Sequence, residues 1–81
     1  MPGVSVLVVD DNRFVQPLVA RLLQTNGYEV RVACSARAAR EVLADRPAEV
    51  LVLDVRLGDG SGWSVLEDVL ARRPEQQVIM M

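Results

Sequence analysis

Two stretches, VLVVDD at residues 6–11 and VLVLD at residues 50–54, decide the fold of this chain. Each is a run of four apolar residues that ends on one or two aspartates. An uninterrupted apolar run of this length is typical of a strand that is covered on both faces of a sheet. The two runs therefore predict buried strands, each with carboxylates at the point where it ends.

Helical patterns separate these strands from two others. Apolar residues at 15–23 recur at helical spacing, and Gly27 can end that helix in the left-handed conformation. Ser35 can cap a second helix, and a third helix is expected at about 63–72. The remaining strands are expected in EVRVACS, residues 29–35, and in QVIMM, residues 77–81.

Strands that alternate with helices through short connections imply right-handed crossovers and one parallel sheet. We expect an α/β fold of the flavodoxin-like class, (βα)3β, with the strand order 2-1-3-4. In this order the first and third strands are neighbours. Ligands of such sheets bind at the carboxyl ends of the strands, where the strand order reverses.

Composition excludes several classes of protein. With 51% hydrophobic and 25% charged residues, the 81 residues suit one globular domain. The net charge of −2, without a basic run, argues against nucleic-acid binding. No apolar run approaches the roughly 20 residues that span a membrane, and the N-terminus lacks a signal-peptide pattern. We expect a cytoplasmic protein without a membrane partner, in which the single cysteine, Cys34, is buried.

The aspartates at the strand ends predict a metal site. In the expected strand order, Asp10, Asp11 and Asp54 converge on one crevice. At about 5 Å and an effective dielectric constant near 20, each pair of ionised carboxylates repels by about 3 kcal/mol. A small domain has only about 5 to 15 kcal/mol of total stability, so either some of these acids hold protons or a cation lies among them. A site with few oxygen ligands favours Mg²⁺.

With these residues in place, the sequence resembles the receiver domain, the phosphoacceptor module of two-component response regulators. The motifs VLVVDDN, NGYEV, RPAEVLVLDVRLGDGSG and VIMM fall at the spacing of that family. The resemblance implies that Asp54 accepts a phosphoryl group from a histidine kinase or a phosphotransfer protein. It further implies that Asp11 and Asp54 bind Mg²⁺ directly, that Asp10 binds it through water, and that the backbone carbonyl of Arg56 completes the protein ligands.

Expectations also follow for four further residues. The Arg56 side chain either modulates the lifetime of the aspartyl phosphate, as the resemblance implies, or is simply solvated. Phe14 either contributes to a kinase-docking surface or is partly buried. Asp59 is expected to be a turn residue, and Trp63 a packing residue rather than a ligand contact.

The sequence departs from the family pattern at its C-terminal end. A complete receiver continues for about 40 residues more, within the usual size of a small domain. By the resemblance, that part carries a switch Ser or Thr and a lysine, whereas this chain has no lysine and a single threonine, Thr25. We therefore expect residues 1–81 to be a truncated receiver domain. The open edge of its fourth strand is expected to pair in a homodimer or with a partner chain.

The sequence is also compatible with functions other than phosphoacceptance. The same fold could be an interaction module, a pseudo-receiver or kinase-binding competitor that is not phosphorylated. A Mg²⁺-dependent phosphatase that forms an aspartyl phosphate usually carries a DxD motif, whereas Val55 and Arg56 follow Asp54. We therefore expect no enzyme beyond a phosphoacceptor that assists its own phosphorylation and dephosphorylation. The chain could also be an excised piece of a longer regulator.

Overall fold

The predicted sheet is present in the computed structural model, which describes residues 3–81. Four parallel strands lie in the order β2-β1-β3-β6, so the expected order 2-1-3-4 is confirmed with β6 as the fourth strand. The sheet strands are β1 (Ser5–Val9), β2 (Glu29–Ala33), β3 (Val50–Leu53) and β6 (Gln77–Met80). The glycine-rich segment after β3 forms an antiparallel hairpin of β4 (Arg56–Leu57) and β5 (Gly60–Ser61).

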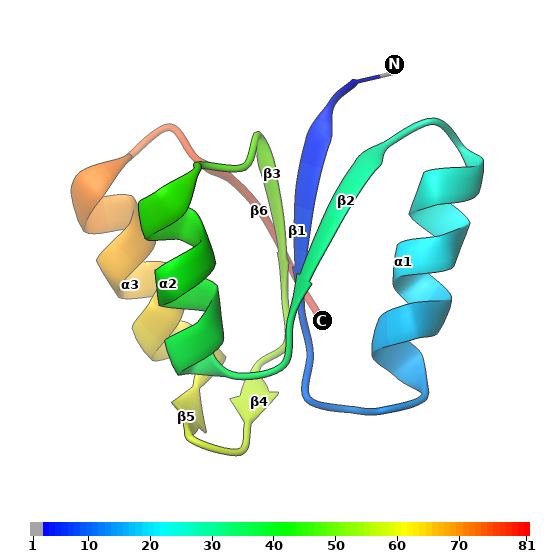
Figure 1. Cartoon of the computed structure of the whole chain (residues 1–81). Coiled ribbons are helices and arrows are strands. Elements are labelled where there is room, and N and C mark those ends of the chain that lie inside the picture. Colours follow the sequence, from blue (N-terminus) through cyan, green and yellow to red (C-terminus); the bar gives the residue numbers. More distant parts are fainter. Residues whose placement is uncertain (1–2) are drawn as a thin grey trace.

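The helices cover the two faces of the sheet unequally. Helix α1 (Val15–Thr25) lies alone on one face, and α2 (Ala36–Asp45) and α3 (Gly62–Arg72) lie on the other (Figure 1). The local signals for the helix ends are confirmed: the Ser35 hydroxyl accepts a hydrogen bond from the Ala38 amide, and Gly27 adopts a φ of 89° after α1. None of these helices, within the described part of the chain, is long and apolar enough to cross a membrane.

The larger hydrophobic core lies between the sheet and the helices α2 and α3. Its fully buried members include Leu7, Leu51, Leu53 and Val65. The smaller core, on the α1 face, is formed by Val6, Val8 and Val52 with partly buried neighbours. Val19 and Leu23 of α1 pack there, whereas Leu18 and Leu22 remain 70% and 64% exposed. The α1 face therefore leaves apolar surface in contact with solvent.

The expectation that Cys34 is buried is wrong. Cys34 is exposed, and it follows the last residue of β2, an edge strand of the sheet. Val32, two residues earlier, is 46% exposed as well. The elements beside this edge strand do not cover the Cys34 side chain, although its position in an apolar segment predicts burial.

Candidate functional site

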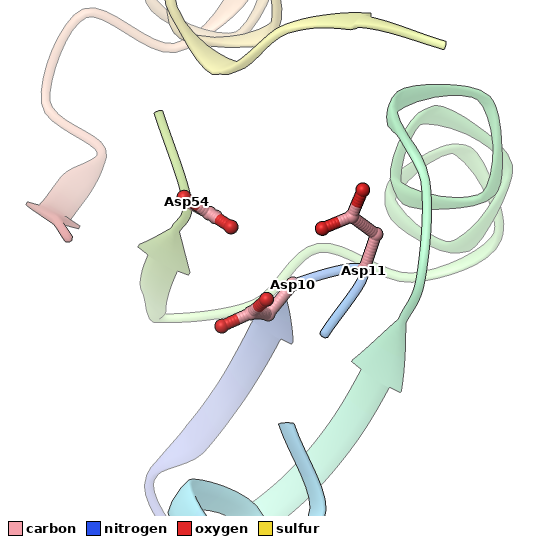
Figure 2. Close-up of side chains that lie close together, drawn as sticks. All are labelled: Asp10, Asp11 and Asp54. Carbon is pink, nitrogen blue, oxygen red and sulfur yellow. The ribbon is translucent and has the colours of Figure 1, made fainter. Parts of the chain in front are cut away.

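The three aspartates of the predicted site lie together at the carboxyl ends of β1 and β3. Val9 and Leu53, the last residues of these strands, are paired in the parallel register, so Asp10 and Asp54 leave the sheet side by side. Each of Asp10, Asp11 and Asp54 places a carboxylate oxygen within 4.8 Å of the other two (Figure 2). The predicted convergence of the three acids is confirmed.

The three carboxylates differ in exposure and therefore in electrostatics. Asp10 is only 4% exposed, whereas Asp54 is half-buried and Asp11 is exposed. Burial raises the pKa of Asp10 above its ordinary value, and the negative charges of Asp54 and Asp11 raise it further. A hydrogen bond of 2.8 Å from the Asn12 amide to Oδ1 of Asp10 opposes this rise. Without a cation, burial and the neighbouring negative charges thus disfavour the ionised form of Asp10.

Backbone contacts hold Asp54 in place. Its amide donates to the carbonyl of Val9 at 2.9 Å, and its Oδ1 accepts a hydrogen bond from the Arg56 amide at 3.1 Å. The Gly62 amide donates to the carbonyl of Val55 at 2.8 Å, and a Cβ atom at position 62 would collide with the carbonyl oxygen of Asp54. A glycine is therefore required at position 62 for α3 to start so close to Asp54.

Arg56 begins the hairpin two residues after Asp54. Its side chain is exposed and forms no ion pair with any described residue, so a solvated arginine agrees with the structure. Its backbone amide has a role that the sequence did not indicate, as a hydrogen-bond donor to Asp54. The proposed metal contact of its carbonyl oxygen stays a prediction.

Asp59 has a contact that sequence reasoning missed. It lies in the turn of the β4–β5 hairpin, as expected, but its Oδ1 accepts a hydrogen bond from the Ala36 amide at 2.8 Å and its Oδ2 accepts one from the Arg37 amide at 3.1 Å. These two bonds at the start of α2 lower the pKa of Asp59 below its ordinary value. Sequence signals for helix caps cover a few neighbouring residues, whereas this cap joins residues more than 20 positions apart.

Two aromatic residues near this edge of the sheet are more exposed than expected. Phe14 is 83% exposed, so ordinary partial burial is wrong for this residue. The Asn12 side chain accepts hydrogen bonds from the amides of Phe14 and Val15 at 2.9 and 3.0 Å, which fixes Phe14 at the start of α1. Trp63, in the first turn of α3, is 52% exposed, so packing accounts for only part of its surface.

Comparisons with known proteins agree on one family. The sequence model described as "Response regulator receiver domain" matches residues 6–81. The acid tolerance regulatory protein ActR of Sinorhizobium medicae is 35% identical over 80 residues, which are 99% of this chain and 41% of ActR. The chain thus spans less than half the length of this curated relative.

Solved structures give the same result. The receiver domain of NtrX from Brucella abortus superposes with a TM-score of 0.88 at 34% identity, covering 93% of this chain and 64% of that domain. The chemotaxis response regulator CheY4 of Vibrio cholerae superposes with a TM-score of 0.91 at 26% identity, covering 96% of this chain and 67% of CheY4.

Proposed function

The chain belongs to the response regulator receiver domain family, and from this membership we propose that it accepts a phosphoryl group on Asp54 in two-component signalling. Receiver domains interact with histidine kinases or phosphotransfer proteins, which are the expected donors. The observation that carries the proposal is the gathering of Asp10, Asp11 and Asp54 within 4.8 Å at the carboxyl edge of the sheet. We further propose that residues 1–81 act as one receiver domain in the cytoplasm.

The donor set fits a small, hard divalent cation. Receiver domains bind Mg²⁺ at an acidic pocket, and carboxylate oxygens are ligands that Mg²⁺ accepts, together with water. Asp11 and Asp54 would hold the ion directly, Asp10 through water, and the carbonyl oxygen of Arg56 would complete the protein ligands. The raised pKa of Asp10 supports the fit, because a carboxylate that is unfavourable when ionised alone is stabilised by a positive partner. When bound, the ion offsets the negative charge on the phosphoryl oxygens during transfer.

The proposed reaction is one displacement at phosphorus. A carboxylate oxygen of Asp54 attacks the phosphorus atom of a phosphohistidine, the new O–P bond forms, and the P–N bond to the partner's imidazole breaks. Asp54 suits this role because it is half-buried and its other oxygen, Oδ1, is fixed by the Arg56 amide. Residues 1–81 contain no histidine, so the phosphoryl group must come from a donor outside this segment. We propose no enzymatic activity beyond that of a phosphoacceptor that assists its own phosphorylation and dephosphorylation.

The partner's docking surface is proposed on α1. Phe14, Leu18 and Leu22 are spaced four residues apart and are 83%, 70% and 64% exposed. Residues at this spacing lie on one side of a helix, and Asn12 joins this stripe to the acids at the end of β1. A kinase that packs on the stripe would therefore bring its histidine to the acidic edge.

The outer edge of β6 supports association of this chain. Among residues 3–81, β6 pairs only with β3, and Ile79 is 56% exposed on it. Unpaired strand edges with apolar side chains favour pairing with another strand. We propose that a second copy or a partner chain covers this edge. Sedimentation that shows only monomers of this chain at micromolar concentration would remove the homodimer.

The second candidate function is binding without phosphoryl transfer, and the same exposed stripe on α1 favours it. Incubation with radiolabelled acetyl phosphate and MgCl₂ separates the two functions. We expect Mg²⁺-dependent label that is absent from Asp54→Asn, whereas a pure binding module would remain unlabelled and would still bind a kinase.

MgCl₂ titration followed by Trp63 fluorescence, with and without beryllofluoride, tests the metal site. Absence of a response to either would contradict the proposed site.

A further inference from the structure

We propose that Asp59 is a positioning residue for the acidic site, which it serves by tying the β4–β5 hairpin to the start of α2. The inference deepens the proposed function and rests on it, because the site that it positions is the proposed metal and phosphoacceptor site. Asp59 itself does not belong to the cluster of Asp10, Asp11 and Asp54.

The hairpin is anchored on the start of α2. The first amides of a helix have no partners within the helix and carry partial positive charge. The Asp59 carboxylate accepts hydrogen bonds from two of these amides, those of Ala36 and Arg37, at 2.8 and 3.1 Å. The Ser35 hydroxyl bonds a third, that of Ala38, at 3.0 Å. The start of α2 is therefore capped by one local residue and by one residue of the hairpin.

The same hairpin lies close to the acidic cluster. Arg56 pairs with Ser61 across the hairpin, and its amide donates to Oδ1 of Asp54 at 3.1 Å. Gly58, the neighbour of Asp59, lies so close to Asp11 that a Cβ atom at position 58 would be 3.3 Å from Oδ2 of Asp11. The hairpin thus forms a hydrogen bond with Asp54 and lies close to Asp11, the two carboxylates that are proposed to hold the metal directly.

Asp59 is the polar anchor of this hairpin on α2. Leu57, which is 7% exposed, anchors the first strand of the hairpin in the larger core, to which Ala36 also belongs. An apolar contact limits the position of Leu57, but it has no directional bond that fixes the turn at residues 58–59. The two hydrogen bonds of Asp59 supply that direction. Without them the turn can move, and with it the groups that face Asp54 and Asp11. Metal and catalytic sites depend on such supporting contacts.

The test compares three variants of the full chain. Asp59→Ala removes the anchor and a helix cap, whereas Ser35→Ala removes a cap of the same helix and leaves the hairpin in place. Asp59→Asn keeps an oxygen acceptor and loses the charge. Mg²⁺ dissociation constants come from Trp63 fluorescence and calorimetry, and phosphorylation rates come from acetyl phosphate at saturating MgCl₂. Amide exchange of Arg56 reports on the hydrogen bond to Asp54 independently of either activity.

We expect Asp59→Ala to weaken Mg²⁺ binding by roughly tenfold, the lower end of the effect of removing an outer contact of a metal site. Its phosphorylation rate at saturating MgCl₂ should fall, and the Arg56 amide should exchange faster. Ser35→Ala should match the wild type in all three, and Asp59→Asn should recover part of the loss. Equal losses in Asp59→Ala and Ser35→Ala, or no loss in either, would overturn the inference. Failure of the wild type to bind Mg²⁺ or accept phosphate would instead overturn the proposed function.

Discussion

Carboxylates in two regions at the same end of the sheet have opposite effects on the folded state. Asp10 is buried beside Asp11 and Asp54, and its pKa is raised by burial and by their charges. Asp59 is exposed and accepts hydrogen bonds from two helix amides, which lower its pKa. The neighbouring groups, rather than the residue type, decide whether a carboxylate stabilises the fold. The ionised carboxylate of Asp59 stabilises the folded state, whereas that of Asp10 destabilises it. A bound cation is expected to offset the destabilisation at Asp10.

The largest expected effect is that of Asp54→Asn on phosphorylation. The amide oxygen and nitrogen of asparagine are poor nucleophiles, so incorporation of phosphate from acetyl phosphate should be lost completely. The matched control is Asp68→Asn, which removes an exposed carboxylate on α3 that pairs with Arg40 at 2.8 Å. This control should incorporate phosphate at the wild-type rate. Label that persists in Asp54→Asn would place the acceptor on another residue.

The next effect concerns Asp10→Asn, which should change stability and metal binding in opposite directions. Asparagine can still accept the hydrogen bond from the Asn12 amide, but it removes the repulsion with Asp11 and Asp54. Without metal, the free energy of unfolding should rise by roughly 1 to 2 kcal/mol. With metal, stabilisation by MgCl₂ should shrink, because one proposed ligand has lost its charge. Urea unfolding without MgCl₂, and at MgCl₂ concentrations that increase in 10-fold steps, measures both changes. A metal-free Asp10→Asn variant that is less stable than the metal-free wild type would contradict this prediction.

The pattern of apolar runs was sufficient to predict the sheet and the meeting of the acids. Four-residue runs ending at Asp10 and Asp54 imply buried parallel strands, and their adjacency follows from the strand order. Both predictions rest on short segments in which every residue is apolar. Such a segment indicates a strand that is buried on both faces of the sheet. The helices were predictable for the same reason, since Ser35 and Gly27 act on residues near them in the sequence.

The contacts of the second region could not be predicted because they join distant segments. Nothing near Asp59 in the sequence indicates that Ala36 and Arg37 will lie beside it. The exposure of Cys34 and Leu18 is also a tertiary property, since it depends on how far the neighbouring elements extend over each face. Apolar residues whose partners lie elsewhere in space are the ones for which a sequence pattern overestimates burial.

A smaller effect, with a distinctive sign, is the dependence of stability on pH in the acidic cluster. The folded metal-free protein binds a proton at Asp10 more readily than the unfolded chain does, because the pKa of Asp10 is raised. Its contribution to stability should therefore fall as pH rises from about 4 through the raised pKa. In MgCl₂ the trend should reverse, because protons compete with the cation. Denaturant unfolding of wild type and Asp10→Asn across this range isolates the contribution, and identical slopes would show that Asp10 titrates normally.

The smallest effect is expected at Asp59, and its sign is opposite. The folded state favours the ionised form of Asp59, because the amides of Ala36 and Arg37 donate to it. Its contribution is complete above the ordinary pKa of an aspartate, about 4, and is lost as pH falls through the lowered pKa. Asparagine cannot ionise, so Asp59→Asn should remove this loss of stability at acid pH. It should leave unchanged the dependence of stability on pH that Asp10 contributes above pH 4. Because the carboxylate is exposed to solvent, the difference should be smaller than that of Asp10→Asn.

If Asp59→Asn instead changed the slope assigned to Asp10 in metal-free protein, the hairpin and the acidic cluster would be coupled electrostatically. The two carboxylate regions could then no longer be treated as independent contributions to stability.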